Sequence, residues 1–230
     1  MNFLSGGLPT VLSEKKLRVL SEETWRSVSL KSNFRLGVQS AIAMPKVGGS
    51  IYVGMNMGEW GGGLQRVDSA TGEITKIERR HDKGLCSGPL NSDCDPVTGL
   101  IPDPQNSDCV LATVGLVHLF RSEGRLLRVC GEHVTLVSDE ETTGELGGKQ
   151  TEAFYGLVPA SVGFWAITWR AVYHFGADGK KDKQYPLPEL KYFAGIHLSR
   201  EIPGVIIVRT DVNWAVSTSG YTPLVIPIND

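Results

Sequence analysis

The chain has 230 residues, of which 41% are hydrophobic, and a formal net charge of −2. This length can bury a substantial core in one or two domains. The near-neutral charge and the lack of a long basic run argue against nucleic-acid binding driven by phosphate neutralisation. No apolar stretch approaches the roughly 20 residues that a helix needs to cross a bilayer, so no membrane insertion is expected.

The first segment, residues 8–31, predicts three short strands at 10–12, 17–20 and 25–30. Apolar residues mark each strand, but no obvious leading strand precedes them. We therefore interpret this segment as an incomplete first unit of a repeat.

A complete unit follows, with predicted strands at 38–44, 51–56, 64–68 and 73–77. The last of these strands alternates apolar and polar side chains. The turn before it reads SATG, and Gly72 supplies the positive φ that hairpin turns require and that a Cβ makes costly.

Residues 80–108 are crowded with Pro, Gly, Asn and Asp, so they predict a long loop. The cysteines Cys86, Cys94 and Cys109 lie within or beside it, and Cys130 follows. The chain has no C-x-x-C pair and no nearby paired histidines, so zinc ligation is poorly supported. Buried free thiols are expected at Cys109 and Cys130, whereas Cys86 and Cys94 would bridge a loop in an exported protein.

Three more units are predicted at 109–137, 153–188 and 193–228, with an acidic, glycine-containing connection at 138–151. Each unit is expected to contain a hairpin. Its two strands are predicted at 109–114 and 117–121 in the first of these units, at 164–169 and 172–176 in the second, and at 205–210 and 214–218 in the third. The turns that follow read SEG, ADG and TSG. They place Gly124, Gly179 and Gly220 at points that match Gly72.

Four-stranded units that recur at about 40–50 residues are typical of a β-propeller. No helix-period pattern of useful length interrupts them. The sequence therefore predicts a single all-β domain over residues 1–230. It is expected to be a β-propeller of about five blades, with an incomplete first blade and a long inter-blade insertion at 80–108.

The repeats also carry a family resemblance. The segments IYVGMNMGEWGGGLQRVDSATGEITKI, SDCVLATVGLVHLFRSEGRLLRV and GFWAITWRAVYHFGADGKK resemble the broad bacterial propeller-repeat superfamily. That superfamily includes two-component-regulator, quinoprotein-like and WD40-like propellers, and the resemblance covers roughly residues 36–228. It implies a scaffold with a central channel and variable loops. It implies no chemistry, because propellers host hydrolases, lyases, sensors and adaptors alike.

The turns that join the second and third strands of each blade are expected to gather around the mouth of the channel. The candidate ligand-binding residues at these turns are Asn56, Glu59, Trp60, Trp169, Arg170, Arg209, Asp211 and Asn213. Aromatic faces with a few polar groups in one concavity would make a ligand pocket. Taken singly, each residue also has a structural interpretation, such as a tryptophan at a wet edge or a turn-forming Asp or Asn.

The remaining motifs give weaker evidence of a function. Asp93 and Asp95 are spaced like the start of a calcium loop, but the later ligands are absent, so a turn is favoured. The five histidines show no metal spacing, and His118 and His174 are interpreted as an echo of the repeat. The chain contains no GxSxG elbow and no phosphate-binding glycine loop. No catalytic residue, metal ligand or cofactor site is predicted.

The leading hypothesis is a non-catalytic recognition module that binds a protein or a small ligand at the channel face. The alternative is a metal-dependent hydrolase that resembles propeller lactonases, with Asn56, Glu59, Asp211 and Asn213 as candidate ligands. The N-terminal segment lacks a basic n-region and an apolar h-region, which predicts a cytoplasmic protein. Export is expected instead if a signal has been removed.

Overall fold

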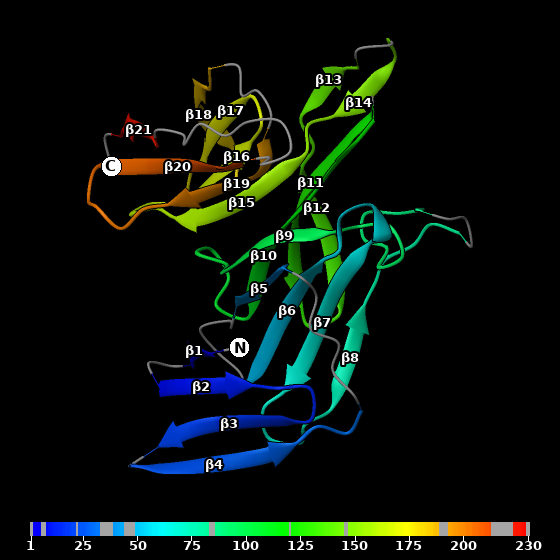
Figure 1. Ribbon diagram of the computed structural model, residues 1–230, viewed down its shortest axis with the longest axis vertical. Coiled ribbons are helices and arrows are strands. Elements are labelled where there is room, and N and C mark those ends of the chain that lie inside the picture. The colour runs from blue at the N-terminus through cyan, green and yellow to red at the C-terminus, as the bar shows by residue number, and fades with distance from the viewer. Residues whose placement is uncertain are drawn as a thin grey trace.

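The computed structural model describes residues 2–228 apart from 6–7, 22, 33–38, 44–48, 83–85, 120, 145–146, 189–192 and 213–222. Regular structure in this part consists of strands β1 to β21 and one 3-10 turn, η1 (Gly58–Trp60) (Figure 1). The predicted all-β class is confirmed. None of the described residues forms a helix long and apolar enough to span a membrane.

The first two sheets are antiparallel meanders in which consecutive strands pair. The first is β1 (Asn2–Ser5), β2 (Leu8–Leu12), β3 (Lys16–Ser21) and β4 (Thr24–Ser29), and the second is β5 (Gln39–Ala43), β6 (Ser50–Asn56), β7 (Gly62–Asp68) and β8 (Ile74–Ile77). The expectation of an incomplete first unit is wrong, because β1 supplies its leading strand. With only four residues, β1 is too short to produce a recognisable alternation.

The turn between β7 and β8 forms as the sequence predicts. The Asp68 carboxylate accepts hydrogen bonds from the backbone N–H groups of Ala70 and Thr71, at 2.9 and 2.7 Å. Gly72 follows with a φ of +72°. A short Asp side chain that holds its own turn, followed by a left-handed glycine, is a common way to close a hairpin.

The third sheet is β9 (Val97–Pro102), β10 (Cys109–His118), β11 (Arg121–Cys130) and β12 (His133–Ser138). Its first strand, β9, lies inside the segment 80–108, which was expected to be a loop throughout. The sequence of β9, VTGLIP, carries a glycine and ends on a proline, and it stands among turn-forming residues that hide it.

The hairpin of the third sheet is also longer than predicted. β10 and β11 pair from Cys109 opposite Cys130 to His118 opposite Arg121. Gly124 therefore lies within a strand, opposite Gly115, and does not form the expected turn. The next turn contains Gly131, with a φ of +62°.

The last third of the chain forms two further sheets and a separate hairpin. The hairpin consists of β13 (Glu141–Thr143) and β14 (Lys149–Thr151). The fourth sheet consists of β15 (Phe154–Pro159), β16 (Phe164–Thr168), β17 (Ala171–Phe175) and β18 (Lys181–Pro186). The fifth sheet consists of β19 (Phe193–Ser199), β20 (Val205–Val212) and β21 (Leu224–Pro227). Gly179 has the predicted positive φ, +75°. The predicted strand 214–218 and Gly220 lie outside the described residues, and β21 pairs with β20 instead.

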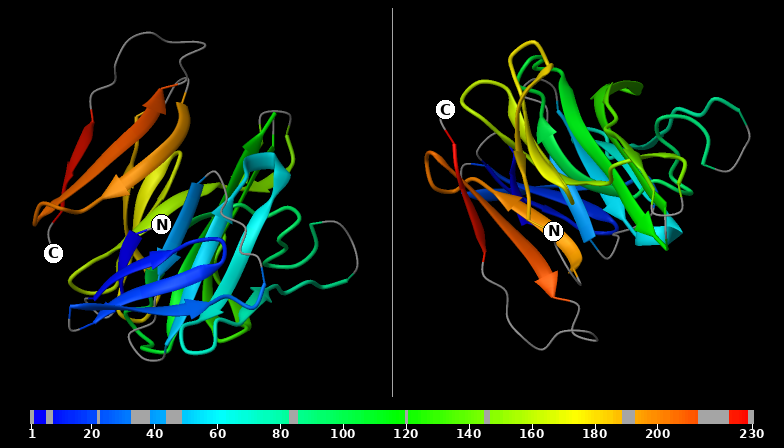
Figure 2. Two further views of the ribbon diagram at one scale, coloured as in Figure 1. Left: turned by 60° about the horizontal axis from the view of Figure 1, so that its bottom comes forward. Right: turned by 90° about the horizontal axis from the view of Figure 1, so that it is seen from above.

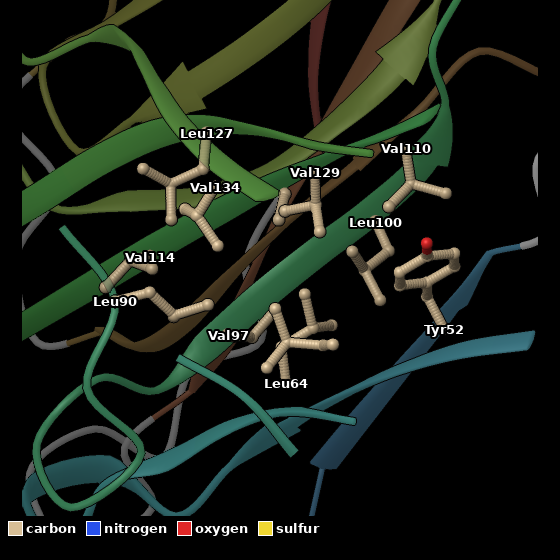
Figure 3. Packing of buried hydrophobic residues seen from close by; sticks show 12 residues of the cluster. Tyr52, Leu64, Leu90, Val97, Leu100, Val110, Val114, Leu127, Val129 and Val134 are labelled. Atoms are coloured by element: carbon tan, nitrogen blue, oxygen red, sulfur yellow. The ribbon is translucent and has the colours of Figure 1, made fainter. Parts of the chain in front are cut away.

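The sheets pack face to face in chain order, and Figure 2 shows them following one another. A cluster of buried hydrophobic residues fills the space between each sheet and the next. The first space holds Leu12, Leu17, Ile51, Val53 and Val67, and the second holds Leu64, Ile77, Val110 and Leu127. The third holds Ile101, Leu111, Phe154 and Phe164, and the fourth holds Trp165, Ile167, Ile206 and Val208. Figure 3 shows the second of these clusters. The leading strands β5, β9, β15 and β19 adjoin in that order.

Glycine lets the third and fourth sheets approach closely. A Cβ added to Gly115 would lie 1.8 Å from the carbonyl oxygen of Phe154, and one added to Gly99 would lie 2.9 Å from the Cα of Gly156. Gly115 is therefore a point of backbone contact between sheets, not a hairpin turn. The Thr98 hydroxyl donates to the same Phe154 carbonyl oxygen, at 2.8 Å.

All four cysteines form disulfides, Cys86–Cys94 and Cys109–Cys130. The expectation of free thiols at Cys109 and Cys130 is wrong; it rested on the apolar strand patterns around both residues, which do not show that the two strands pair. In the actual register these two residues lie directly opposite each other on β10 and β11, with Cα atoms 4.3 Å apart. The Cys86–Cys94 bridge is the one that the sequence associates with export.

Candidate functional site

The turn between β6 and β7 is shaped by backbone packing. Gly61, Gly62 and Gly63 all have positive φ. The loop behind them accepts two of their hydrogen bonds, from Gly62 N–H to the Ser92 carbonyl at 3.0 Å and from Gly63 N–H to the Asp95 carbonyl at 2.8 Å. A Cβ on Gly63 would lie 2.3 Å from the Ser92 Cβ. The loop thus holds the turn in a fixed position.

This turn presents an acid and an aromatic side chain to the outside. The Asn56 carboxamide oxygen accepts a hydrogen bond from the N–H of Gly58, the first residue of the 3-10 turn, at 2.9 Å. Glu59 and Trp60 follow, and the Trp60 side chain is 75% exposed. Most of the Trp60 ring is therefore in contact with solvent.

The turn between β10 and β11 lies against the turn between β6 and β7. The His118 Nδ1 lies 2.6 Å from the Glu59 Oε2, and both side chains are about half exposed. Pairs of this kind contribute little to stability in water, usually under about 1 kcal/mol. The contact does, however, bring two turns from different sheets together.

Apolar side chains are exposed on both of these turns. They are Met57 at 44%, Trp60 at 75%, Val117 at 45% and Leu119 at 79% exposed. We call these four residues the turn patch. Leu119 also has a φ of +54°, in the left-handed region that disfavours any side chain as large as leucine.

The turn between β16 and β17 carries Trp169 and Arg170. The Thr168 hydroxyl oxygen accepts hydrogen bonds from Arg170 N–H and Ala171 N–H, each at 3.2 Å, and so fixes the turn. The Arg170 guanidinium carbon lies 4.5 Å from the centroid of the Trp169 ring. One part of Trp169 packs against the core between the fourth and fifth sheets, as the sequence suggests.

Trp169 and Arg170 also line a small cavity of about 60 Å³ beside the turn patch. Its other lining residues are Val117, Leu119, Arg121, Ser122, Thr142, Thr143, Gly144 and Gln150. We call this cavity the side groove. It joins the turn of the fourth sheet to that of the third, so turns from three consecutive sheets meet on one face.

A second cavity, of about 180 Å³, lies where four sheets converge, and we call it the central cavity. It is lined by Asn56, Gly58, Thr98, Gly115, Leu116, Val117, Tyr155, Gly195, Ile196 and His197. Tyr155 is largely buried, and this burial raises the pKa of its phenol to about 12. At neutral pH the Tyr155 hydroxyl therefore keeps its proton.

The residues that the sequence predicts for the site do not all lie in one place. Asn56 lines the central cavity, Glu59 and Trp60 stand on the neighbouring turn, and Trp169 and Arg170 line the side groove. Arg209 is exposed on β20, opposite His197. Asp211 lies opposite Gly195 on the same strand, but its side chain and the whole of Asn213 are outside the described residues.

The sequence did not indicate Val117, Leu119, Tyr155 or His197 as site residues. Apolar residues at the end of a strand pattern are read as core, so nothing in the sequence marked Leu119 as exposed. The pairing of His118 with His174 as equivalent positions is wrong. His118 ends β10, whereas His174 is buried in β17 with its Nδ1 2.5 Å from Asp182 Oδ1.

The described residues do not form a cluster of three or more His, Cys, Asp or Glu side chains suited to a metal ion. In the calcium-like segment, the Asp93 carboxylate pairs with Arg80 at 2.8 Å and that of Asp95 with Arg125 at 2.5 Å. Glu59 pairs with His118, so its carboxylate is already engaged. No protein-family model matches this chain, and no curated protein matches it either.

Proposed function

We propose that the protein is a non-catalytic recognition module, built as a β-propeller, that binds a partner protein through the turn patch. Five meander sheets that pack in chain order, with adjoining leading strands, support the propeller architecture. Propellers present their turns on a common face. The meeting of turns from the second, third and fourth sheets agrees with that arrangement.

Leu119 is the observation that carries the proposal. Its side chain is 79% exposed, and its backbone φ is +54°. Solubility favours a polar residue at such a position, and backbone strain favours glycine. We take a leucine that satisfies neither requirement, beside three further exposed apolar side chains, as support for contact with another molecule.

The neighbours of Leu119 suit a protein partner. An exposed tryptophan among apolar side chains, with polar groups around it, is typical of the centre of a protein–protein interface. Trp60 supplies this aromatic side chain, and the Glu59–His118 pair supplies polar groups beside it.

The two disulfides support a place of action outside the cytoplasm. Disulfides persist in oxidising compartments and are rare where glutathione keeps thiols reduced. Both cysteine pairs of this chain are bridged. Of the two compartments that the sequence suggests, they favour export.

Selection of binding peptides from a random library tests the proposal directly. Random peptides displayed on phage are selected on the folded protein, and the affinities of the enriched peptides are measured as synthetic peptides in solution. We expect Trp60→Ala to weaken binding at least tenfold, which corresponds to about 1.4 kcal/mol. Trp25→Ala is the matched control, because Trp25 is 49% exposed on β4 of the first sheet, away from the turn patch.

Two results would count against the proposal. Selection that enriches no binding peptide would remove its support. Peptides that bind the Trp60→Ala variant and the unmodified protein equally well would show that recognition occurs elsewhere.

A further inference from the structure

The side groove differs from the turn patch in its charge. Among the described residues, the charged side chains that line it are Arg121 and Arg170, and both are cations. Arg121 has one weak partner, Glu123, at 3.4 Å on the exposed surface. Arg170 lies over the Trp169 ring and has no acidic partner in the described part of the chain. The groove therefore offers two guanidinium groups to an occupant.

Two of the lining residues also carry a polar atom without a hydrogen-bond partner in the ranges that the structure describes. The Trp169 Nε1 and the Thr142 Oγ1 are buried and have no partner among the described residues. An unsatisfied buried polar group costs about 1–3 kcal/mol. The amide of Gln150, by contrast, is engaged, because its oxygen accepts the hydrogen bond of the Ser122 N–H at 2.8 Å.

These groups share one chemical property. The two guanidinium groups of the lining residues donate hydrogen bonds and cannot accept any, and the indole N–H of Trp169 is likewise only a donor. Their complement is an anion that only accepts. A carboxylate fits this requirement, and arginine binds it through two parallel hydrogen bonds.

Size restricts the occupant further. At about 60 Å³ the groove has room for about two water molecules, at roughly 30 Å³ each. It is too small for a complete drug-sized ligand. It is large enough for a carboxylate that projects from a larger molecule resting on Val117 and Leu119, which line the groove and belong to the turn patch.

We propose that the side groove receives a carboxylate of the partner protein that docks on the turn patch. Arg121 and Arg170 bind this carboxylate, either from an Asp or Glu side chain or from a chain terminus. The inference rests on the proposed function, since it names the chemistry of that partner.

The first test uses the peptides selected on the folded protein. Each Asp or Glu is replaced by Asn or Gln, and a separate version carries a C-terminal amide. We expect one of these changes to weaken binding about tenfold to the unmodified protein and to have little effect on the Arg170→Gln variant, as in a double-mutant cycle. The version that loses affinity identifies the source of the carboxylate. Arg26→Gln on β4 is the matched control, and thermal unfolding checks that each variant is folded.

The second test needs no selected peptide. N-acetylglutamate and its neutral analogue N-acetylglutamine are titrated into ¹⁵N-labelled protein, and the indole signal of Trp169, assigned with Trp169→Phe, is followed by NMR. We expect a saturable shift with N-acetylglutamate alone, and its loss in Arg170→Gln. Equal shifts with both compounds, or a shift that persists in Arg170→Gln, would overturn the inference.

The two proposals fail in different ways. Peptides that need Trp60, but neither a carboxylate nor Arg170, would overturn the carboxylate site and leave the recognition function standing. A saturable N-acetylglutamate shift without any enriched peptide would support the carboxylate site and remove support for docking of a protein.

Discussion

Glu78 is the residue that ties the second sheet to the loop behind the β6–β7 turn. Its carboxylate accepts a hydrogen bond from Ser92 N–H at 3.1 Å and pairs with Lys76 at 2.8 Å and Arg80 at 2.9 Å. Burial alone would raise the pKa of Glu78, but hydrogen bonds from Lys76, Ser92 and Arg80 outweigh it and lower this pKa from 4.5 to about 2. The charged form is thus the one that stabilises the fold.

The pH dependence of stability follows from that shift. Because the pKa is lower in the folded state, the contribution of Glu78 is complete above about pH 4.5 and is lost as the pH falls towards 2. We expect Glu78→Gln to lower the free energy of unfolding by about 1–3 kcal/mol at pH 7. Urea unfolding at pH 7, 4 and 2.5 should show this difference shrinking with acid. A difference that stays constant over this range would contradict the role given to the charge.

Leu119 illustrates at the same scale what the sequence could not predict. Spacing placed Asn56, Glu59, Trp60, Trp169 and Arg170 on turns, and the structure places them on turns or at strand ends. The exposure of Leu119 depends on where the β10–β11 hairpin closes. That position is set by pairing with β11 over its whole length, which local patterns do not encode.

At the scale of elements, the loop 86–96 acts as a support for a functional turn. It contacts Gly61, Gly62 and Gly63 through its backbone, and the Cys86–Cys94 bridge closes it. Two backbone hydrogen bonds, from Gly62 and Gly63 to this loop, hold the β6–β7 turn.

Removal of this bridge should loosen the turn. We expect the double variant Cys86→Ser, Cys94→Ser to lose about 2–3 kcal/mol of stability, the value for a loop of this length. Amide hydrogen exchange at Gly62 and Gly63 should accelerate, because their acceptors are in the loop. The Gly176 amide, which bonds to Lys180 in the fourth sheet, is the internal control. Equal acceleration at all three amides would indicate a global effect and contradict the local support.

Elements differ in how well the sequence predicts them. The second and fourth sheets follow from apolar runs and from turns with Gly72 and Gly179. The third sheet was mispredicted because Gly115 and Gly124 look like turn residues, although they face each other in a ladder and let another sheet approach. A glycine needed for tertiary contact cannot be distinguished from a turn glycine in one sequence.

At the scale of the whole molecule, stability comes from sheets that pack on their neighbours in the chain. Middle strands such as β16 and β17 are buried along their length, whereas the outer strand β18 is exposed at most positions. This gradient from inside to outside agrees with the blade arrangement that we propose. The stability of the fold should therefore depend on close packing between the leading strands and the strands next to them.

Gly115 tests that requirement. In Gly115→Ala the new Cβ would meet the Phe154 carbonyl oxygen at 1.8 Å, and backbone cannot move aside as a side chain can. We expect a loss of about 3 kcal/mol or more in the free energy of unfolding. Gly156→Ala is the control, because a Cβ there meets no atom within 4 Å and should change stability little. Equal stability of the two variants would show that the third and fourth sheets are not packed this closely.

Recognition through the turn patch is the central claim, and Leu119→Gly tests it most directly. Glycine adopts the observed φ of +54° without strain, so the variant should melt at the same temperature or higher, with a gain of up to about 1 kcal/mol. The same change removes an apolar contact and should weaken binding of the selected peptides at least tenfold. Melting temperature and peptide affinity are measured on the same preparation. A variant that stays folded and binds the peptides with unchanged affinity would contradict the claim.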